Sequence, residues 1–333
     1  MRVAINGYGR IGRCILRAIT ERNLQDRLEI VAINDLSDLG IMAHLTRFDS
    51  THGPFRGRVE TGPGTLIVDG RAIPVTAIKD PADLPWREHQ VDLVLECAGK
   101  FKQRSALAGH LDAGAQRVLV SHPVGDADRT LVYGVNHEQL TAADRIVSNA
   151  SCTTNCLAPV AKILHDRIGI EQGIMTTIHA VTNDQQLLDK AHGDPYRARG
   201  AMQSIVPTKT GAAAAVGLVL PELAGRLSGM ALRVPVANVS LVDLHFTARR
   251  DTSVDEINQV MREAAAGAWQ GILACNELPL VSVDFNHHPA SSIFDLHHTA
   301  VAGRQAKVMS WYDNEWGFTN RMIDVALYLS RSG

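Results

Sequence analysis

The chain has 333 residues, which is long for one hydrophobic core, so its length predicts two domains. Hydrophobic residues make up 45% of it and charged residues 20%, a composition that is typical of a soluble globular protein and excludes disordered and fibrous classes. The formal net charge of -2 argues against nucleic acid or an acidic membrane as the main partner, because both require a basic surface.

The N-terminus "MRVAING" leads directly into a strand-like run and shows none of the three regions of a secretion signal. No apolar run approaches the roughly 20 residues of a membrane helix, so we expect a cytoplasmic protein without membrane contact. The five cysteines, an odd number, argue against a structural disulfide framework in that compartment. One or more of the thiols is therefore available for chemistry.

Short β-branched runs alternate with helix-like stretches through the first 150 residues. Because the apolar residues in these runs barely alternate with polar ones, they predict strands that helices cover on both faces. The fold class is therefore α/β, with a doubly wound parallel sheet of the Rossmann type. The elements in chain order are "RVAIN", "GRCILRAITER", "EIVAIND", "VDLVLECAG", "SALAGHLDAGA", "QRVLVSHP" and "RIVSNAS".

Longer strand candidates follow from about residue 170, namely "GIMTTIHAVT", "RVPVANVSLVDLHFTARR" and "AKVMSWYD". Residues 240–248 alternate polar with apolar side chains, which predicts an α+β domain whose mostly antiparallel or mixed sheet has one solvated face. The domain change should lie close to Cys152. The final run "NEWGFTNRMIDVALYLSRS" predicts a helix, and the Pro and Gly clusters at 53–64 and 193–211 predict loops.

A glycine-rich turn follows the first predicted strand, where Gly7, Gly9 and Gly12 form the pattern G-x-G-x-x-G. The second strand ends in Asp35, at the distance from which a carboxylate can bind a ribose 2′-hydroxyl. The glycines would let a pyrophosphate approach the helix N-terminus, with Arg10 and Ile11 against it. Asp35 would repel a 2′-phosphate, which favours NAD over NADP.

Two simpler interpretations of this region remain open. The glycine pattern could be a tight turn without a ligand, and Asp35 could be the N-cap of a helix. The position of Asp35 at the carboxyl end of a strand, where such sheets bind ligands, favours a role in dinucleotide binding.

The segment "SNASCTTNCLAP" places Cys152 at the start of a predicted helix and Cys156 one turn further, facing inward, with Pro159 as an irregularity. A disulfide between them is geometrically awkward, and a zinc site lacks a second C-x-x-C pair, so we expect no metal. A nucleophile fits best, because the positive end of a helix dipole lowers the pKa of a thiol. "TTIHA" supplies His179 as a base, although a histidine in the core is the alternative.

These features together resemble the phosphorylating glyceraldehyde-3-phosphate dehydrogenases, and the resemblance extends over essentially the whole chain. It implies an NAD-binding domain at 1–151, rejoined by a C-terminal helix at 315–333, a catalytic domain at 152–314 and a homotetramer. It also implies NAD as the cofactor, a phosphorylated aldose as the substrate and inorganic phosphate as the second reactant. The motifs that carry it are "INGYGRIGR", "DSTHG", "SNASCTTNCLAP", "TTIHA", "PTKTGAAAAVG", "RVPVANVS" and "WYDNEWGFTNR".

The resemblance also assigns roles to residues, with Cys152 as the nucleophile and His179 as its base. The thiolate would attack the aldehyde, hydride would leave for NAD, and phosphate would cleave the resulting thioester. The Cys152 amide and a protonated His179 would stabilise the oxyanion. The implied cofactor residues are Gly7, Gly9, Arg10, Ile11, Gly12, Asp35, Gly99, Ser121, Asn314 and Phe318. Thr182, Asp184 and Arg233 resemble the residues around the substrate phosphate, and Ser151, Thr153, Thr210 and Gly211 those around inorganic phosphate.

Several stretches are more similar to the sister erythrose-4-phosphate dehydrogenases, among them "SHP" with His122, "LVYGVN", "NDQQ" and "ELPLVSVDFNH". Those enzymes hydrolyse the thioester with water and need no site for inorganic phosphate. Because Thr210 and Gly211 are in place here, the phosphorylating triose enzyme is favoured. A non-catalytic NAD-binding or scaffold protein is a third interpretation, against which the presence of Cys152 and His179 argues.

Overall fold

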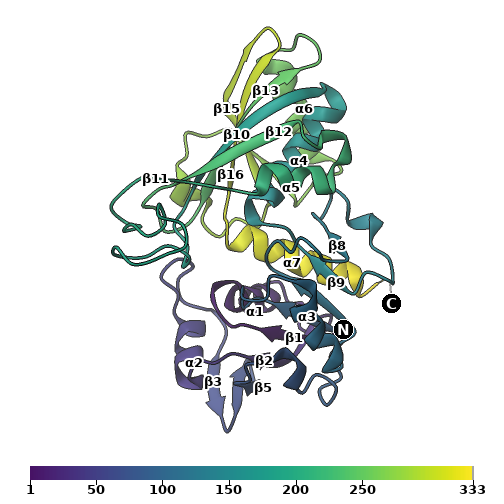
Figure 1. The fold of residues 1–333 in the computed structure, drawn as a ribbon, viewed down its shortest axis with the longest axis vertical. Helices are drawn as coiled ribbons and strands as arrows, with labels where there is room; N and C mark the ends of the chain where they lie inside the picture. Colours follow the sequence, from purple (N-terminus) through teal and green to yellow (C-terminus); the bar gives the residue numbers. More distant parts are fainter. Residues whose placement is uncertain (332–333) are drawn as a thin grey trace. The chain divides into compact units, whose positions relative to one another are not determined.

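The computed structural model describes residues 1–331, which form two compact units (Figure 1). The first unit contains residues 1–131, 137–150 and the C-terminal segment that begins at Thr319. The second contains 132–136 and 151–318. Each unit is built on one β-sheet, the first largely parallel and the second mixed, so the predicted fold class is confirmed.

The sheet of the first unit has nine strands in the order β3-β4-β5-β2-β1-β6-β7-β9-β8. All strands from β5 to β8 in this order run parallel, and β3 and β4 extend the sheet as antiparallel strands. Val3, Ala4 and Ile5 of the central strand are fully buried, as the unbroken apolar runs predicted. The elements are β1 (Arg2–Asn6), α1 (Arg10–Glu21), β2 (Glu29–Asn34), α2 (Leu39–Arg47), β3 (Val59–Gly62), β4 (Thr65–Val68), β5 (Arg71–Thr76), η1 (Pro81–Asp83), β6 (Leu93–Glu96), α3 (Arg104–Asp112), β7 (Arg117–Val120), β8 (Arg129–Thr130), η2 (His137–Gln139) and β9 (Ile146–Ser148).

The sheet of the second unit has seven strands in the order β11-β12-β10-β13-β16-β15-β14. Two pairs, β10 with β12 and β14 with β15, are parallel, and the other neighbours are antiparallel. Helix α4 packs against β15 and β16, and α6 packs against β14 and β15. The elements are α4 (Cys152–Arg167), β10 (Ile170–His179), β11 (Val206–Thr208), α5 (Ala212–Val219), η3 (Pro221–Leu223), β12 (Leu227–Arg233), β13 (Ser240–Ala248), α6 (Val254–Ala266), β14 (Leu273–Asn276), η4 (Ser282–Phe285), β15 (Ser292–Ala302), β16 (Gln305–Tyr312) and α7 (Trp316–Leu329), the last of which continues into the first unit.

Two details of the predicted elements are wrong. The run 233–250 is not one strand, because β12 ends at Arg233 and β13 begins only at Ser240. Pro235 lacks an amide hydrogen, and Val239 has a left-handed φ of 69°, so the chain turns between them. The two Pro and Gly clusters are also not only loops, since they contain β3 and β11.

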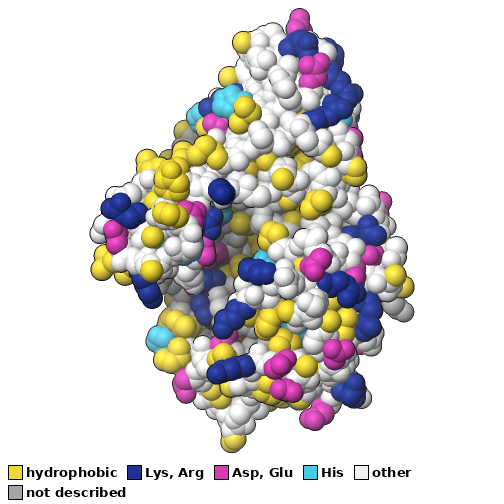
Figure 2. All heavy atoms as spheres, in the orientation of Figure 1, with side chains coloured by type: hydrophobic (Ala, Val, Ile, Leu, Met, Phe, Trp, Pro, Cys, Tyr) yellow, Lys and Arg dark blue, Asp and Glu magenta, His cyan; other side chains and the backbone are white. Residues whose placement is uncertain are grey.

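The segment between β10 and β11 forms a long irregular excursion on the surface of the second unit (Figure 1). Hydrophobic side chains gather on it beside charged ones, as Figure 2 shows. The most exposed of them are Leu187, Leu188 and Ile205. Among residues 1–331, no helix combines the length and the apolar character that crossing a membrane demands. Residues 332 and 333 of the predicted C-terminal helix lie outside the described part of the chain.

Candidate active site

The glycine turn connects β1 to α1 in a conformation that only glycine allows. Gly7 has a φ of 89°, and a Cβ atom at this residue would lie 2.4 Å from the backbone nitrogen of Ala98. A Cβ atom on Gly12 would lie 2.2 Å from the carbonyl oxygen of Gly7. Gly9 is the N-cap of α1 and offers no side chain to its first amides. The turn therefore leaves the backbone amides at the N-terminus of α1 uncovered by side chains, as binding of a pyrophosphate requires.

Asp35 follows β2, and its carboxylate binds the backbone of the glycine turn at Tyr8. Its carboxylate accepts hydrogen bonds from the amides of Tyr8 at 2.6 Å and Ser37 at 2.9 Å. Burial opposes ionisation, but the hydrogen bonds from Ser37 and Tyr8 outweigh it and lower the pKa of Asp35. The N-cap of α2 is Asp38, not Asp35, so the simpler interpretation of Asp35 is wrong.

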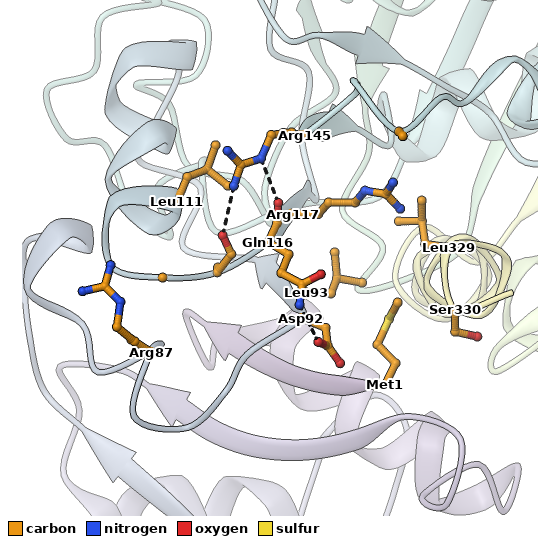
Figure 3. Close-up of a pocket in the computed structure, with 13 residues that line it drawn as sticks. Met1, Arg87, Asp92, Leu93, Leu111, Gln116, Arg117, Arg145, Leu329 and Ser330 are labelled. Carbon is orange, nitrogen blue, oxygen red and sulfur yellow. Dashed lines mark hydrogen bonds between the residues drawn. The ribbon is translucent and has the colours of Figure 1, made fainter. Parts of the chain in front are cut away.

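Two of the cavities of the first unit lie at opposite edges of its sheet. A cavity of about 210 Å³ lies at the carboxyl ends of the strands, where Gly7, Gly9 and Asp35 line it. The other, of about 700 Å³, lies at the amino ends of β6 and β7 and is lined by Arg87, Arg117 and Arg145 among others (Figure 3). Open parallel sheets bind nucleotides at their carboxyl edge, so the smaller cavity is the candidate dinucleotide site despite its size.

The other predicted cofactor residues of the first unit lie around the same edge of the sheet. The Arg10 guanidinium forms an ion pair with Asp49. Ile11 is half-buried in the first turn of α1, and Gly99 has a φ of 69° in the turn after β6. Ser121 follows β7, and its hydroxyl bonds to the thiol of Cys97.

In the second unit, the thiol of Cys152 and the imidazole of His179 lie together. Cys152 is the first residue of α4, whose N-cap Ser151 accepts a hydrogen bond from the Thr154 amide. The Cys152 Sγ atom is 3.5 Å from the Nε2 atom of His179. His179 is the last residue of β10, and the parallel pairing with β12 places Arg233 directly opposite it. The register of two strands therefore brings His179 to Arg233, and the start of α4 adds the thiol of Cys152.

The buried imidazole of His179 lies between a carbonyl group and a cation. Its Nδ1 atom is 2.6 Å from the carbonyl oxygen of Ala180 and 2.6 Å from Nη1 of Arg233, which also donates to that oxygen at 2.9 Å. Burial and the charge of Arg233 lower the pKa of His179 to about 3. The ring is therefore neutral near pH 7 in this state, and the protonated His179 that was expected as an oxyanion donor stays a prediction for the reaction itself.

The predicted lowering of the pKa of Cys152 is wrong for the protein without bound cofactor or substrate. Burial raises the pKa of the Cys152 thiol, although the Arg233 charge and nearby amides act in the opposite direction. The helix dipole that was expected to favour the thiolate is thus outweighed by the loss of water around the sulfur. Burial raises the pKa of Cys156 to about 12 and that of Cys275 to about 11.

A pH profile of alkylation tests this electrostatic description. Only the thiolate reacts, so the rate of Cys152 alkylation by iodoacetamide in the NAD-free protein should rise continuously from about pH 6 to about pH 9. Cys152 should still react faster than the other thiols. His179 should add no inflection in this range, because it is already neutral. A rate that is constant from neutral pH upward would instead indicate a preformed thiolate and imidazolium pair.

The predicted phosphate-binding residues all belong to the second unit. Thr182 and Asp184 lie directly after β10, and Asp184 forms an ion pair with Arg197. Gly211 is the N-cap of α5 without a capping side chain, and the hydroxyl of Thr210 accepts a hydrogen bond from the Ala212 amide. Ser151 and Thr153 flank Cys152, and the buried Thr153 hydroxyl is 2.8 Å from that of Tyr312.

Asn314 and Phe318, the two predicted cofactor residues of the second unit, are both buried. The Oδ1 atom of Asn314 accepts a hydrogen bond from the Ser240 hydroxyl at 2.8 Å, and that hydroxyl accepts one from the Ala180 amide. This chain of bonds connects Asn314 to the end of β10, directly after His179. Because Oδ1 faces Ser240, the Asn314 amide hydrogens point away from that hydroxyl.

Sequence reasoning missed three residues of this site. Arg197 binds Asp184 and the Thr208 hydroxyl, Ser240 orients Asn314, and the Tyr312 hydroxyl lies between those of Thr153 and Thr177. Tyr312 lies in the motif "WYDNEWG", two residues before Asn314, to which the resemblance had assigned a role. No local pattern indicated Arg197 or Ser240, because both reach the site through tertiary contacts.

A dinucleotide-type glycine turn in one unit and a thiol beside a histidine in the other define the class of the protein as a nucleotide-dependent oxidoreductase. Residues 1–104 match the family model described as the NAD binding domain of glyceraldehyde 3-phosphate dehydrogenase, and residues 151–314 match its C-terminal domain. The chain therefore belongs to the glyceraldehyde-3-phosphate dehydrogenase family, and its cofactor is NAD.

Curated relatives with the name glyceraldehyde-3-phosphate dehydrogenase cover almost the whole chain. The protein from Pseudomonas aeruginosa is 61% identical over 330 residues, 99% of this chain and 98% of that protein. The plasmid-encoded protein from Cupriavidus necator is 56% identical over 333 residues, 100% of this chain and 99% of its own length. The protein from Cereibacter sphaeroides is 57% identical over 332 residues, 99% of each chain.

Proposed function

We propose that this enzyme oxidises D-glyceraldehyde 3-phosphate to 1,3-bisphosphoglycerate with NAD and inorganic phosphate, the oxidative step of glycolysis, through a thiohemiacetal and a thioester on Cys152. The observation that carries the proposal is the Cys152 thiol at the start of α4, 3.5 Å from Nε2 of His179 and beside Arg233. The names of the relatives support the triose substrate.

In the mechanism, His179 acts as a general base on the thiol of Cys152. Arg233 can only donate, so this role requires that its Nη1 group donates to the Ala180 oxygen, at 2.9 Å, and not to Nδ1 of His179. Nδ1 then carries the ring proton and donates it to the same oxygen, and the unprotonated Nε2 faces the sulfur and can accept the thiol proton. The thiolate then attacks the aldehyde carbon to form the thiohemiacetal. The imidazolium and the Cys152 amide donate to its oxygen, and the imidazole recovers the hydroxyl proton as the carbonyl re-forms. NAD, when bound, supplies the hydride acceptor.

The low pKa of His179 is compatible with this role. The neutral ring is ready to accept a proton, and the negative charge that forms on sulfur and oxygen stabilises the imidazolium as the reaction proceeds. After hydride transfer, inorganic phosphate attacks the thioester carbon and the Cys152 thiolate leaves. The products are the acyl phosphate and the free enzyme.

We assign the binding roles to the two domains in the same way. Residues 1–151, rejoined by 315–333, are proposed as the NAD-binding domain and 152–314 as the catalytic domain, which the positions of the two family matches support. We also propose cofactor-binding roles for a set of residues, and the conformation of the glycine turn and the lining of the cavity beside it support this for Gly7, Gly9, Gly12 and Asp35. The whole set is Gly7, Gly9, Arg10, Ile11, Gly12, Asp35, Gly99, Ser121, Asn314 and Phe318.

The substrate phosphate is assigned to Thr182, Asp184 and Arg233, and the Arg233 guanidinium supplies the positive charge. Because Asp184 is itself acidic and pairs with Arg197, its role is to hold that second cation. Inorganic phosphate is assigned to Ser151, Thr153, Thr210 and Gly211. The bare N-terminus of α5 at Gly211 supports this, since its amides are suited to an anion.

We further propose a cytoplasmic homotetramer. None of the five cysteines, all of which lie in the described part of the chain, forms a disulfide, which suits a reducing compartment. Ile174 on β10 and Met230 on β12 are exposed on neighbouring strands of the second sheet, and the segment between β10 and β11 exposes Leu187 and Leu188. Apolar side chains of this size on a surface indicate contact with other protomers. Light scattering of the purified protein measures whether its mass is that of four chains.

The test of the proposed function is NADH formation with glyceraldehyde 3-phosphate and with erythrose 4-phosphate, each with and without inorganic phosphate. We expect the triose to be the faster substrate and its rate to collapse without phosphate. A faster rate on the tetrose that is indifferent to phosphate would establish the sister activity, erythrose-4-phosphate dehydrogenase, instead. Absence of NADH formation with both would overturn the proposal and favour a binding protein.

A further inference from the structure

Glu96 and His110 form a fully buried pair in the first unit. Glu96 is the last residue of β6, His110 lies in α3, and neither has any exposed surface. Their side chains meet through His110 Nε2 and Glu96 Oε2 at 3.0 Å. A carboxylate without contact to water is rare and has to be held by hydrogen bonds, so this pair has a specific role in the unit.

Three donors surround the Glu96 carboxylate. The Asn6 side-chain amide donates to Oε2 at 2.5 Å, the Ala98 backbone amide donates to Oε1 at 2.7 Å, and His110 donates from Nε2. All three donors are neutral groups. The carboxylate is therefore satisfied as an acceptor, and its position is fixed from three directions.

The direction of these bonds follows from Trp86. Its indole nitrogen can only donate, and it lies 3.0 Å from Nδ1 of His110, so Nδ1 is the acceptor. The proton of the neutral imidazole must then be on Nε2, which donates to Glu96. The ring of Phe101 packs edge-on against His110 and helps to hold it. Trp86 thus fixes the tautomer of His110, and His110 fixes Glu96.

The groups that Glu96 holds belong to the dinucleotide cavity. Asn6, Asn34 and Ala98 all line it, together with Gly7. The Ala98 amide that Glu96 binds is the one whose nitrogen would lie 2.4 Å from a Cβ atom on Gly7. On the other side, Asn6 Oδ1 accepts a hydrogen bond from Asn34 at 2.8 Å, and Asn34 in turn binds the backbone of Ile78. The network therefore fixes the groups next to Gly7, at the start of the glycine turn.

We propose that Glu96, oriented by His110 and Trp86, is a positioning residue for NAD: it holds the Ala98 amide and the Asn6 side chain so that the glycine turn is preformed. The proposal rests on NAD binding at this turn. Its consequence is specific, because preorganisation of a cofactor site affects cofactor affinity and leaves the chemistry at Cys152 unchanged.

Calorimetric titration of the full-length protein with NAD tests this with Glu96→Gln. The new amide presents hydrogens to groups that are themselves donors, so we expect NAD to bind about tenfold more weakly. At saturating NAD, kcat should stay within about twofold of the wild-type value, and the alkylation rate of Cys152 should not change. Glu88→Gln, which removes the same charge from an exposed position of the same unit, is the matched control and should bind NAD normally.

Trp86→Phe is the milder second variant if Glu96→Gln does not fold. It keeps an aromatic ring but removes the donor to His110, and we expect NAD to bind roughly two- to fivefold more weakly. In the wild-type protein, long-range nitrogen and proton spectra should show His110 with its proton on Nε2. Equal NAD affinity in the folded variants, or a proton on Nδ1 of His110, would overturn the proposal. If the wild-type protein itself fails to bind NAD, the failure lies with the proposed function.

Discussion

Replacing Cys152 with serine is expected to lower the rate of NADH formation from glyceraldehyde 3-phosphate by roughly 10³-fold or more, because a hydroxyl near His179 is a much weaker nucleophile than a thiolate. Binding of NAD should be unchanged, since the glycine turn and Asp35 belong to the other unit. Steady-state kinetics with calorimetry of NAD binding separates the two effects. Fast alkylation by iodoacetamide should disappear together with the activity.

The matched control for this variant is Cys156→Ser, one turn further along the same helix. Cys156 is fully buried, and its sulfur lies 3.4 Å from the Ser292 hydroxyl and 3.7 Å from the Ser310 carbonyl oxygen, both of which a serine can also bind. We expect this variant to keep its activity within a few-fold. If Cys156→Ser lost its activity while Cys152→Ser kept it, Cys156 and not Cys152 would be the nucleophile.

Replacing His179 with asparagine is expected to lower kcat by about 10²–10⁴-fold, the usual contribution of a general base. Asparagine retains hydrogen-bonding groups near Ala180 and Arg233 but cannot accept the thiol proton at neutral pH. The remaining activity should increase with pH, as hydroxide takes over the deprotonation of Cys152. Rates measured at saturating substrate across pH test this.

His245→Asn is a suitable control, because His245 is an exposed histidine of the same sheet on β13. Its activity should equal that of the wild-type protein. An unchanged kcat in His179→Asn would show that His179 is a packing residue, which was the alternative that its sequence left open.

The elements that position the site could be predicted because local patterns encode them. The turn between β1 and α1 is predicted by Gly7, Gly9 and Gly12. The start of α4 is predicted by Ser151, which precedes Cys152. The final helix was also predicted from its apolar spacing, and Met322, Ile323 and Ala326 are indeed buried in α7. These are short-range features, and a single sequence contains them in full.

The electrostatic state of the site could not be predicted in the same way. The dipole of α4 is visible in the sequence as a helix start, but the burial of Cys152 depends on how other segments pack around it. For His179, the decisive neighbour is Arg233, which comes from another strand. Glu96 gave no signal either, because nothing near it in the sequence shows that Trp86 and His110 enclose it.

The pairing of β10 with β12 has a consequence for how the enzyme becomes active. Cys152 and His179 are 27 residues apart, and His179 and Arg233 are 54 apart, so the three meet only after two non-local strands have found their register. A slip of one residue would turn the His179 side chain to the other face of the sheet. Non-local pairing of this kind is slow in folding, whereas a helix such as α4 forms quickly. During refolding, recovery of dehydrogenase activity should therefore lag behind recovery of helical structure.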